Sequence, residues 1–128
     1  MGLKDFLLSW GMLFAGVLMN VAGVYLVKLK INVLGSVQFD SFMSGVLYFY
    51  HLVRFPVALL GGFLVFAAPL PYAIALSRMD LSVAYPLSIA LNCLLILPMA
   101  AFFMGESISL YKGIGTGLIV VSLFLLYK

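Results

Sequence analysis

Four uncharged polar side chains lie within stretches that are otherwise apolar enough to cross a membrane. Tyr85, Ser88 and Asn92 have the spacing i, i+3 and i+7, so a helix places them on one face. Asn20 is the only polar side chain in the central part of an earlier apolar stretch. An unpaired amide is costly in hydrocarbon, so we expect these side chains to face protein or a water-filled cavity. They either hold helices together or bind a polar substrate by hydrogen bonds.

Charged side chains are absent from the centres of the same stretches. The acidic residues Asp5, Asp40, Asp80 and Glu106 fall at predicted helix ends, as do all Lys and Arg residues. A proton-coupled pump normally has an ionisable group within a span. His51 lies in a connecting segment, where an interfacial position is more common than a proton relay.

Catalytic groups cannot be assembled from this sequence. It contains no nucleophile with a nearby base, no metal-ligand set and no phosphate loop, so we expect neither an enzyme nor a metal or other cofactor. Cys93 is the single cysteine and cannot form a disulfide within the chain. A binding and translocation role is what remains.

The composition defines the elements that must position these residues. Of 128 residues, 66% are hydrophobic and 9% are charged, and the mean hydropathy is +1.25. These values are typical of an integral membrane protein. The net charge of +3 is dispersed along the chain, which argues against a nucleic-acid partner.

Four stretches are long enough to span a bilayer, which takes about 20 apolar residues. They comprise residues 6–27, 56–76, 81–103 and 110–127. Pro69 and Pro71 are expected to bend the second stretch, and Ser109 is a plausible N-cap for the fourth. The sequence thus predicts an all-α membrane protein with one domain covering residues 1–128.

The segment between the first two spans is too long for a hairpin loop and too apolar for a disordered linker. With Asp40 or Ser41 as N-cap, residues 42–53 form a helix. Its shared apolar face comprises Phe42, Val46, Phe49, Tyr50 and Val53. Such a helix either lies in the membrane interface or, as residues 41–54, lengthens the second span.

Small residues indicate where helices approach one another closely. Gly16 and Gly23 flank Asn20 in the first span, and Gly113 and Gly117 form a GxxxG pair in the last. Both pairs predict helix packing or a dimer face. The short motif has many chance matches, so architecture is favoured over a binding site.

Basic residues do not define the orientation of the chain in the membrane. With four spans, the two sides carry nearly equal numbers of cations: Lys4, Arg78 and Lys128 on one, and Lys28, Lys30, Arg54 and Lys112 on the other. Either the chain inserts both ways and pairs with an inverted copy, or a single loop charge or a partner sets its orientation.

Three segments resemble a known superfamily. "LSVAYPLSIALN", "FFMGESISLYKGIGTGLIVVSLFLL" and "NVAGVYLVK" resemble the small four-helix proteins of the drug/metabolite transporter superfamily. That superfamily includes the small multidrug resistance exporters and the EamA-like subunits that flip undecaprenyl-phosphate-aminoarabinose. The resemblance spans the chain except for about residues 31–57, where this protein is longer than the drug exporters.

Two positions bear on the branch of the superfamily. The drug exporters carry a Glu eight residues before a Lys, and the position eight residues before Lys28 is Asn20. The group required for proton-coupled cation antiport is therefore missing. The run from Ala84 to Ser88, "AYPLS", replaces the exporters' "AYAIW" and looks more like the flippase subunits.

The resemblance implies a multi-pass transporter of the bacterial inner membrane that flips a lipid-linked sugar or polyprenyl-phosphate headgroup by alternating access. It implies a homodimer, or a heterodimer with a related chain. The implied headgroup site comprises Asn20, Tyr85, Ser88 and Asn92, and the implied phosphate contacts are Lys28, Arg54 and Arg78. The alternatives are a small exporter of cations or metabolites and a non-transporting accessory subunit.

Overall fold

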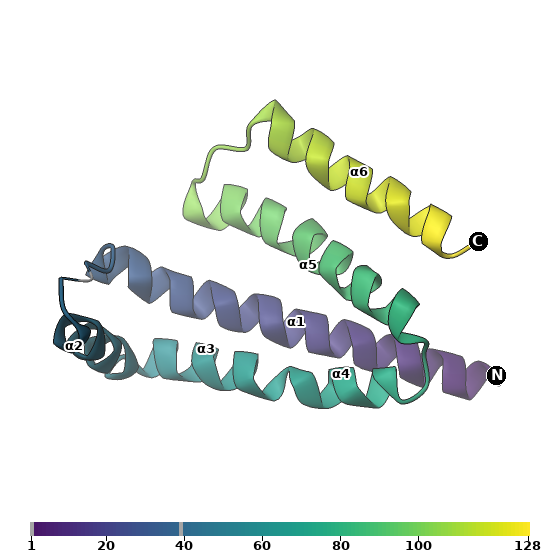
Figure 1. Cartoon of the computed structure of the whole chain (residues 1–128), viewed down its shortest axis with the longest axis horizontal. Helices are drawn as coiled ribbons and strands as arrows, with labels where there is room; N and C mark the ends of the chain where they lie inside the picture. The colour runs from purple at the N-terminus through teal and green to yellow at the C-terminus, as the bar shows by residue number, and fades with distance from the viewer. Residues whose placement is uncertain (1, 39) are drawn as a thin grey trace. The chain divides into compact units, whose positions relative to one another are not determined.

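The apolar stretches of the sequence form helices in the computed structural model, which describes residues 2–38 and 40–128 (Figure 1). The helices in chain order are α1 (Leu3–Leu34), α2 (Phe42–Val53), α3 (Pro56–Ala67), α4 (Pro69–Leu76), α5 (Leu81–Met104) and α6 (Leu110–Leu126). They group into two compact units. Unit 1 comprises α1 up to Leu18 together with Ala68–Lys128, and unit 2 comprises Met19–Ala67.

Within residues 2–38 and 40–128, three stretches of helix are long and apolar enough to cross a membrane. These are α1, the stretch Pro56–Leu76 formed by α3 and α4, and α5. The prediction of an all-α membrane protein is therefore confirmed. Helix α6 is apolar but has 17 residues, or about 25 Å, against a hydrocarbon layer of about 30 Å. A fourth span stays a prediction.

Helix α1 extends seven residues beyond the predicted end of the first span. Its 32 residues give a length of about 48 Å, so it must tilt or project from the hydrocarbon layer. Lys28 and Lys30 do not end it, because lysine is a good helix former. The helix ends before Gly35, whose φ of 85° lies in the left-handed region that glycine adopts without strain.

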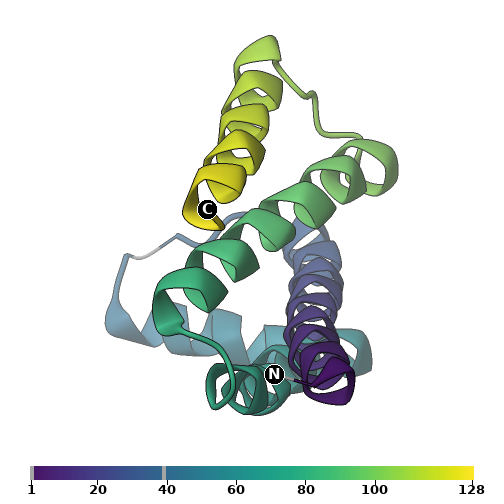
Figure 2. The ribbon, with the colours of Figure 1, turned by 90° about the vertical axis from the view of Figure 1, so that its right-hand side faces the viewer.

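The connecting segment forms a separate helix, α2, with the predicted bounds. Ser41 is its N-cap, and Ser41 and Ser44 make the reciprocal hydrogen bonds of a capping box. Helical structure is interrupted before Pro56, which begins α3, so residues 41–54 do not lengthen the second span. Within unit 2, α2 runs across the direction of α1 and α3, since it is seen end-on in Figure 1 and from the side in Figure 2.

Proline residues also account for the break between α3 and α4. Pro69 occupies the first turn of α4 and Ala68 keeps helical dihedral angles, with φ −54° and ψ −35°. The interruption is therefore local, as predicted from Pro69 and Pro71. In α5, by contrast, Pro86 and Pro98 lie inside one continuous helix.

In unit 1, small residues allow the helices to approach closely. A Cβ atom at Gly16 would lie 3.2 Å from the carbonyl oxygen of Ala68 and 3.3 Å from the backbone nitrogen of Tyr72. The neighbouring residues on this side of α1 are buried, and they are Ser9, Leu13 and Val17. Helix α4 in turn contacts α5, and α5 contacts α6.

In unit 2, two glycines bring the backbones of α1 and α3 together. A Cβ atom at Gly23 would lie 2.6 Å from the carbonyl oxygen of Gly61, and one at Gly61 would lie 2.7 Å from the carbonyl oxygen of Gly23. No side chain larger than hydrogen fits at that distance. Gly16 and Gly23, which the sequence places at a packing or dimer face, therefore both contact helices of their own chain.

Candidate functional site

Tyr85, Ser88 and Asn92 form a polar row along one face of α5 in unit 1. The Ser88 hydroxyl donates a hydrogen bond to the Tyr85 carbonyl oxygen at 2.8 Å. The Asn92 side-chain amide donates to the Ser88 carbonyl oxygen, also at 2.8 Å. Because the helix's own backbone satisfies these donors, both side chains are tolerated in apolar surroundings.

Tyr85 is the most open member of the polar row. The residue is 56% exposed, whereas Ser88 is buried. The Tyr85 hydroxyl has no hydrogen-bond partner among the residues that the structure describes, and it can both donate and accept. Another molecule is therefore most readily recognised through this hydroxyl.

Asn20 belongs to the other unit. It is half-buried on α1, three residues before the Gly23 contact with α3. The sequence predicts that Asn20 shares a site with the polar row. Asn20 lies in unit 2 and the polar row in unit 1, so this shared site stays a prediction.

The cations predicted to contact a phosphate have different surroundings. In unit 1, Arg78 forms an ion pair with Asp5, with an Nη1 to Oδ1 distance of 2.9 Å and both side chains partly exposed. In unit 2, the guanidinium of Arg54 lies 6.0 Å from the ring centre of Tyr50. These contacts already engage two of the three predicted phosphate ligands.

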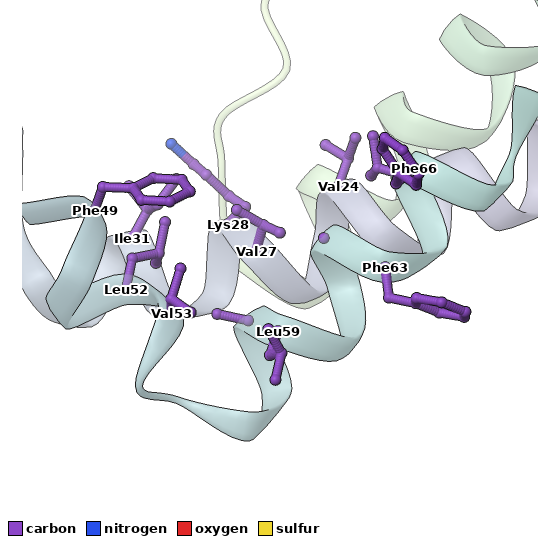
Figure 3. Close-up of a pocket in the computed structure, with 13 residues that line it drawn as sticks. Val24, Val27, Lys28, Ile31, Phe49, Leu52, Val53, Leu59, Phe63 and Phe66 are labelled. Atoms are coloured by element: carbon purple, nitrogen blue, oxygen red, sulfur yellow. The ribbon is translucent and has the colours of Figure 1, made fainter. Parts of the chain in front are cut away.

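Unit 2 contains a large groove, which we name the α1–α2–α3 groove (Figure 3). Its volume is about 960 Å³. Among the residues that the structure describes, Lys28 is the one charged residue in its lining, and the others are apolar or glycine. The lining residues are Val24, Val27, Lys28 and Ile31 of α1, Phe49, Leu52 and Val53 of α2, and Ala58, Leu59, Gly62, Phe63, Val65 and Phe66 of α3.

Lys28 is the third predicted phosphate ligand and has no charged or aromatic partner in the described part of the chain. In Figure 3 its aliphatic stem extends from α1 toward the end of the groove formed by Phe49. The neighbouring Lys30, by contrast, has its amine 5.1 Å from the ring centre of Phe55. Lys28 is thus the cation of unit 2 most available to a ligand.

Sequence patterns did not reveal the groove itself. α2 forms one end of the groove because it runs across α1 and α3. The spacing of apolar residues within a helix does not predict how that helix crosses another. The signal available in the sequence was that residues 42–53 form a short apolar segment of their own. The structure adds that none of the residues of α2 is buried. A helix of that kind lacks a core of its own and must place its apolar residues against lipid or a ligand.

Gly113 and Gly117 lie on an open side of α6. A Cβ atom at either would have no neighbour within 4 Å among the described residues, and α6 contains no buried residue. Unlike Gly16 and Gly23, these glycines are accessible to another helix.

Comparison with known proteins does not place the chain in a family. No family model matches it, and no curated protein or solved structure does either.

Proposed function

We propose that this protein is a membrane transporter that moves the polar headgroup of a lipid-linked substrate, such as a polyprenyl-phosphate sugar, across the bacterial inner membrane. The observation that supports this is the exposed Tyr85 hydroxyl on the spanning helix α5. It has no partner among the described residues and shares a face with Ser88 and Asn92. A hydroxyl in hydrocarbon needs a partner, and a sugar headgroup offers both donors and acceptors.

The lack of charge in the spans supports a neutral substrate site. No Asp, Glu, Lys or Arg occurs in residues 6–27, 55–77 or 81–104. A site of uncharged hydrogen-bonding groups can bind and release a polar headgroup without holding a competing counter-ion. The hydrocarbon tail can stay in the bilayer if the site opens sideways, with the prolines of α5 allowing that helix to bend during alternating access.

The proposed working form has four spans, with α6 as the fourth, and is a dimer of identical or related chains. A single copy offers too few helices to enclose a cavity with two alternating openings. The open glycine face of α6 supports this assembly, because small residues allow close helix contacts in membranes.

The open face of α6 also supports a second candidate, a non-transporting accessory subunit. In that case α6 packs beside an enzyme or another transporter rather than beside a second copy. Cation export is disfavoured, because Asn20 occupies the position where the resemblance places the essential Glu.

Reconstitution in liposomes tests these proposals. A polyprenyl-phosphate sugar carrying a fluorescent label on its headgroup is placed in both leaflets, and a membrane-impermeant quencher is added outside. Complete quenching without an imposed proton gradient supports headgroup movement, with protein-free liposomes as the control. Gradient-dependent uptake of an organic cation contradicts it. If neither occurs and the chain copurifies with one enzyme, the accessory role is supported instead.

A further inference from the structure

We infer that the α1–α2–α3 groove binds one hydrocarbon chain of an anionic membrane lipid, whose phosphate group contacts Lys28. This site is separate from the polar row, and it does not require that the protein transport anything. The argument rests on the groove's dimensions, its walls and the charge at one end.

The groove has the length of a lipid chain in one leaflet. Along α3 it extends from Ala58 to Phe66, which is about 12 Å at the helical rise, and along α1 from Val24 to Ile31, which is about 10 Å. Half of the hydrocarbon layer is about 15 Å thick. Its volume of about 960 Å³ lies at the upper end of the usual range for ligand sites, which reaches about 1,000 Å³.

The ends of the groove differ, which gives the lipid a direction. Figure 3 shows Phe49, Leu52 and Val53 of α2 at one end, with Phe66 and Val24 at the other. Because α2 crosses the two spanning segments, it is oriented to lie in the plane of the membrane interface. The headgroup therefore belongs at the α2 end, and the chain runs along α3 toward Phe66.

Apolar walls alone do not select a lipid. In a bilayer, lipid chains are as apolar as leucine, so there is no hydrophobic gain when a chain moves from its neighbours into the groove. Hydrocarbon will fill the space, but the choice among lipids must come from the headgroup. Selection therefore depends on Lys28, the one charged residue in the described lining.

The charge balance favours an anionic over a zwitterionic headgroup. Lys28 has no acidic partner in the described part of the chain, and Lys30 and Arg54 belong to the same unit. Asp40 is the only acidic residue in residues 19–67. A phosphate can approach Lys28 without displacing an existing ion pair, and a charge-assisted contact then forms.

Photo-crosslinking of the full chain in lipid nanodiscs tests the inference. Two probes carry the same photoactivatable group in the same acyl chain, one on phosphatidylglycerol and one on phosphatidylcholine. We expect label on peptides from residues 24–31 and 49–66, with about a fivefold preference for phosphatidylglycerol, the effect expected of one cation near a membrane surface. Lys28→Gln should remove the preference, while Lys112→Gln, on α6, should retain it.

Gly62→Leu tests the groove itself. Gly62 lines it, and a Cβ atom there meets nothing within 4 Å among the described residues, so the larger side chain fills the groove without disturbing the helix contact. We expect labelling of these peptides by both probes to fall at least fivefold. Gly11→Leu is the matched control. Gly11 lies in α1 outside the groove, and a Cβ atom there also meets nothing within 4 Å among the described residues, so labelling should be unchanged.

Two results would overturn the inference. Equal labelling by the two probes in the unmodified protein would mean general contact with the bilayer, and undiminished labelling in Gly62→Leu would place the lipid elsewhere. The quenching assay on the same preparations separates this site from the proposed function. Selective labelling without headgroup movement would support the lipid site and contradict transport. Headgroup movement without selective labelling would support transport and contradict the lipid site.

Discussion

Unit 1 and unit 2 share helix α1 but offer a ligand different chemistry. Unit 1 carries uncharged hydrogen-bonding groups on α5, and its Arg78 is neutralised by Asp5. Unit 2 carries an apolar groove in which Lys28 is the only charged residue of the described lining, and no described residue neutralises it. The first arrangement suits groups that form hydrogen bonds, and the second suits a hydrocarbon chain with an anion at its end. The two units therefore suit different chemical groups, whether these belong to one amphiphilic molecule or to two separate lipids.

The two units also differ in how tightly α1 packs. In unit 2 the Gly23 and Gly61 backbones leave no room for a Cβ atom, whereas in unit 1 the contact at Gly16 is less tight. By contrast, a Cβ atom added at any glycine of α6 would meet nothing within 4 Å in the described part of the chain. The same residue type therefore serves a closed contact in one place and an open face in another.

The largest effect is expected when alanine replaces the glycine at the closest contact. Gly23→Ala puts a Cβ atom 2.6 Å from the Gly61 carbonyl oxygen and 2.9 Å from the Val65 backbone nitrogen. Backbone atoms cannot move aside without shifting a helix, so we expect a loss of about 2 kcal/mol in the free energy of unfolding. Titration with sodium dodecyl sulfate, followed by circular dichroism, measures it.

Gly16→Ala is the matched change in unit 1. Its nearest contact of 3.2 Å requires only a small adjustment, and alanine gains about 0.5–1 kcal/mol in helix propensity, so the net effect should be near zero. Equal destabilisation by the two variants would contradict the difference in packing between the units.

A smaller effect is expected at the polar row. Tyr85→Phe removes the exposed hydroxyl and keeps the ring, so headgroup movement should slow about tenfold, the equivalent of one hydrogen bond. Asn20→Leu tests the predicted contribution of unit 2 to the same site and should also impair movement. Tyr111→Phe, on the exposed surface of α6, serves as the control.

Dimer assembly must be measured in the same samples, because Tyr85 and Asn20 could also serve only to hold helices together. If Tyr85→Phe or Asn20→Leu prevents dimer formation, these side chains hold helices together and do not form a substrate site. Crosslinking in membranes, compared with the unmodified protein, distinguishes the two outcomes.

The glycines of α6 test whether a glycine without a contact in its own chain, unlike Gly23, serves the contact with another chain. A Cβ atom added at Gly117 would meet nothing within 4 Å among the described residues, so we expect Gly117→Leu to leave folding unaffected. If α6 is a dimer face, the leucine blocks close approach and self-association should weaken by roughly 1 kcal/mol, or about fivefold. Förster transfer between labelled copies in liposomes measures it, and unchanged association would move the dimer face elsewhere.

The smallest effect is expected at the ion pair of unit 1. Asp5→Asn removes the partner of Arg78, but both side chains are partly exposed, so the change in unfolding free energy should stay below about 1 kcal/mol. The same denaturant titration at low and high salt measures it. A loss as large as that of Gly23→Ala would contradict the expectation that a partly exposed ion pair contributes little to the stability of unit 1.

Local structure was largely predictable from local residues. The bounds of α2, the Ser109 N-cap and the break at Pro69 followed from side chains that act within one turn, and the structure confirms them. Helix α1 continues seven residues past the predicted first span of residues 6–27, because lysine residues continue a helix well. The polar row is placed on one face of α5 by helix geometry alone.

The sequence by itself determined that this is a helical membrane protein with uncharged polar residues in its spans, because hydropathy and helical period depend only on the order of residues. Only the tertiary structure decided that Gly23 meets Gly61, that α2 crosses α1 and α3, and that Lys28 borders a groove. Those features join residues that are distant in the chain. Their distances depend on how helices pack, and no pattern within one helix encodes the approach of another.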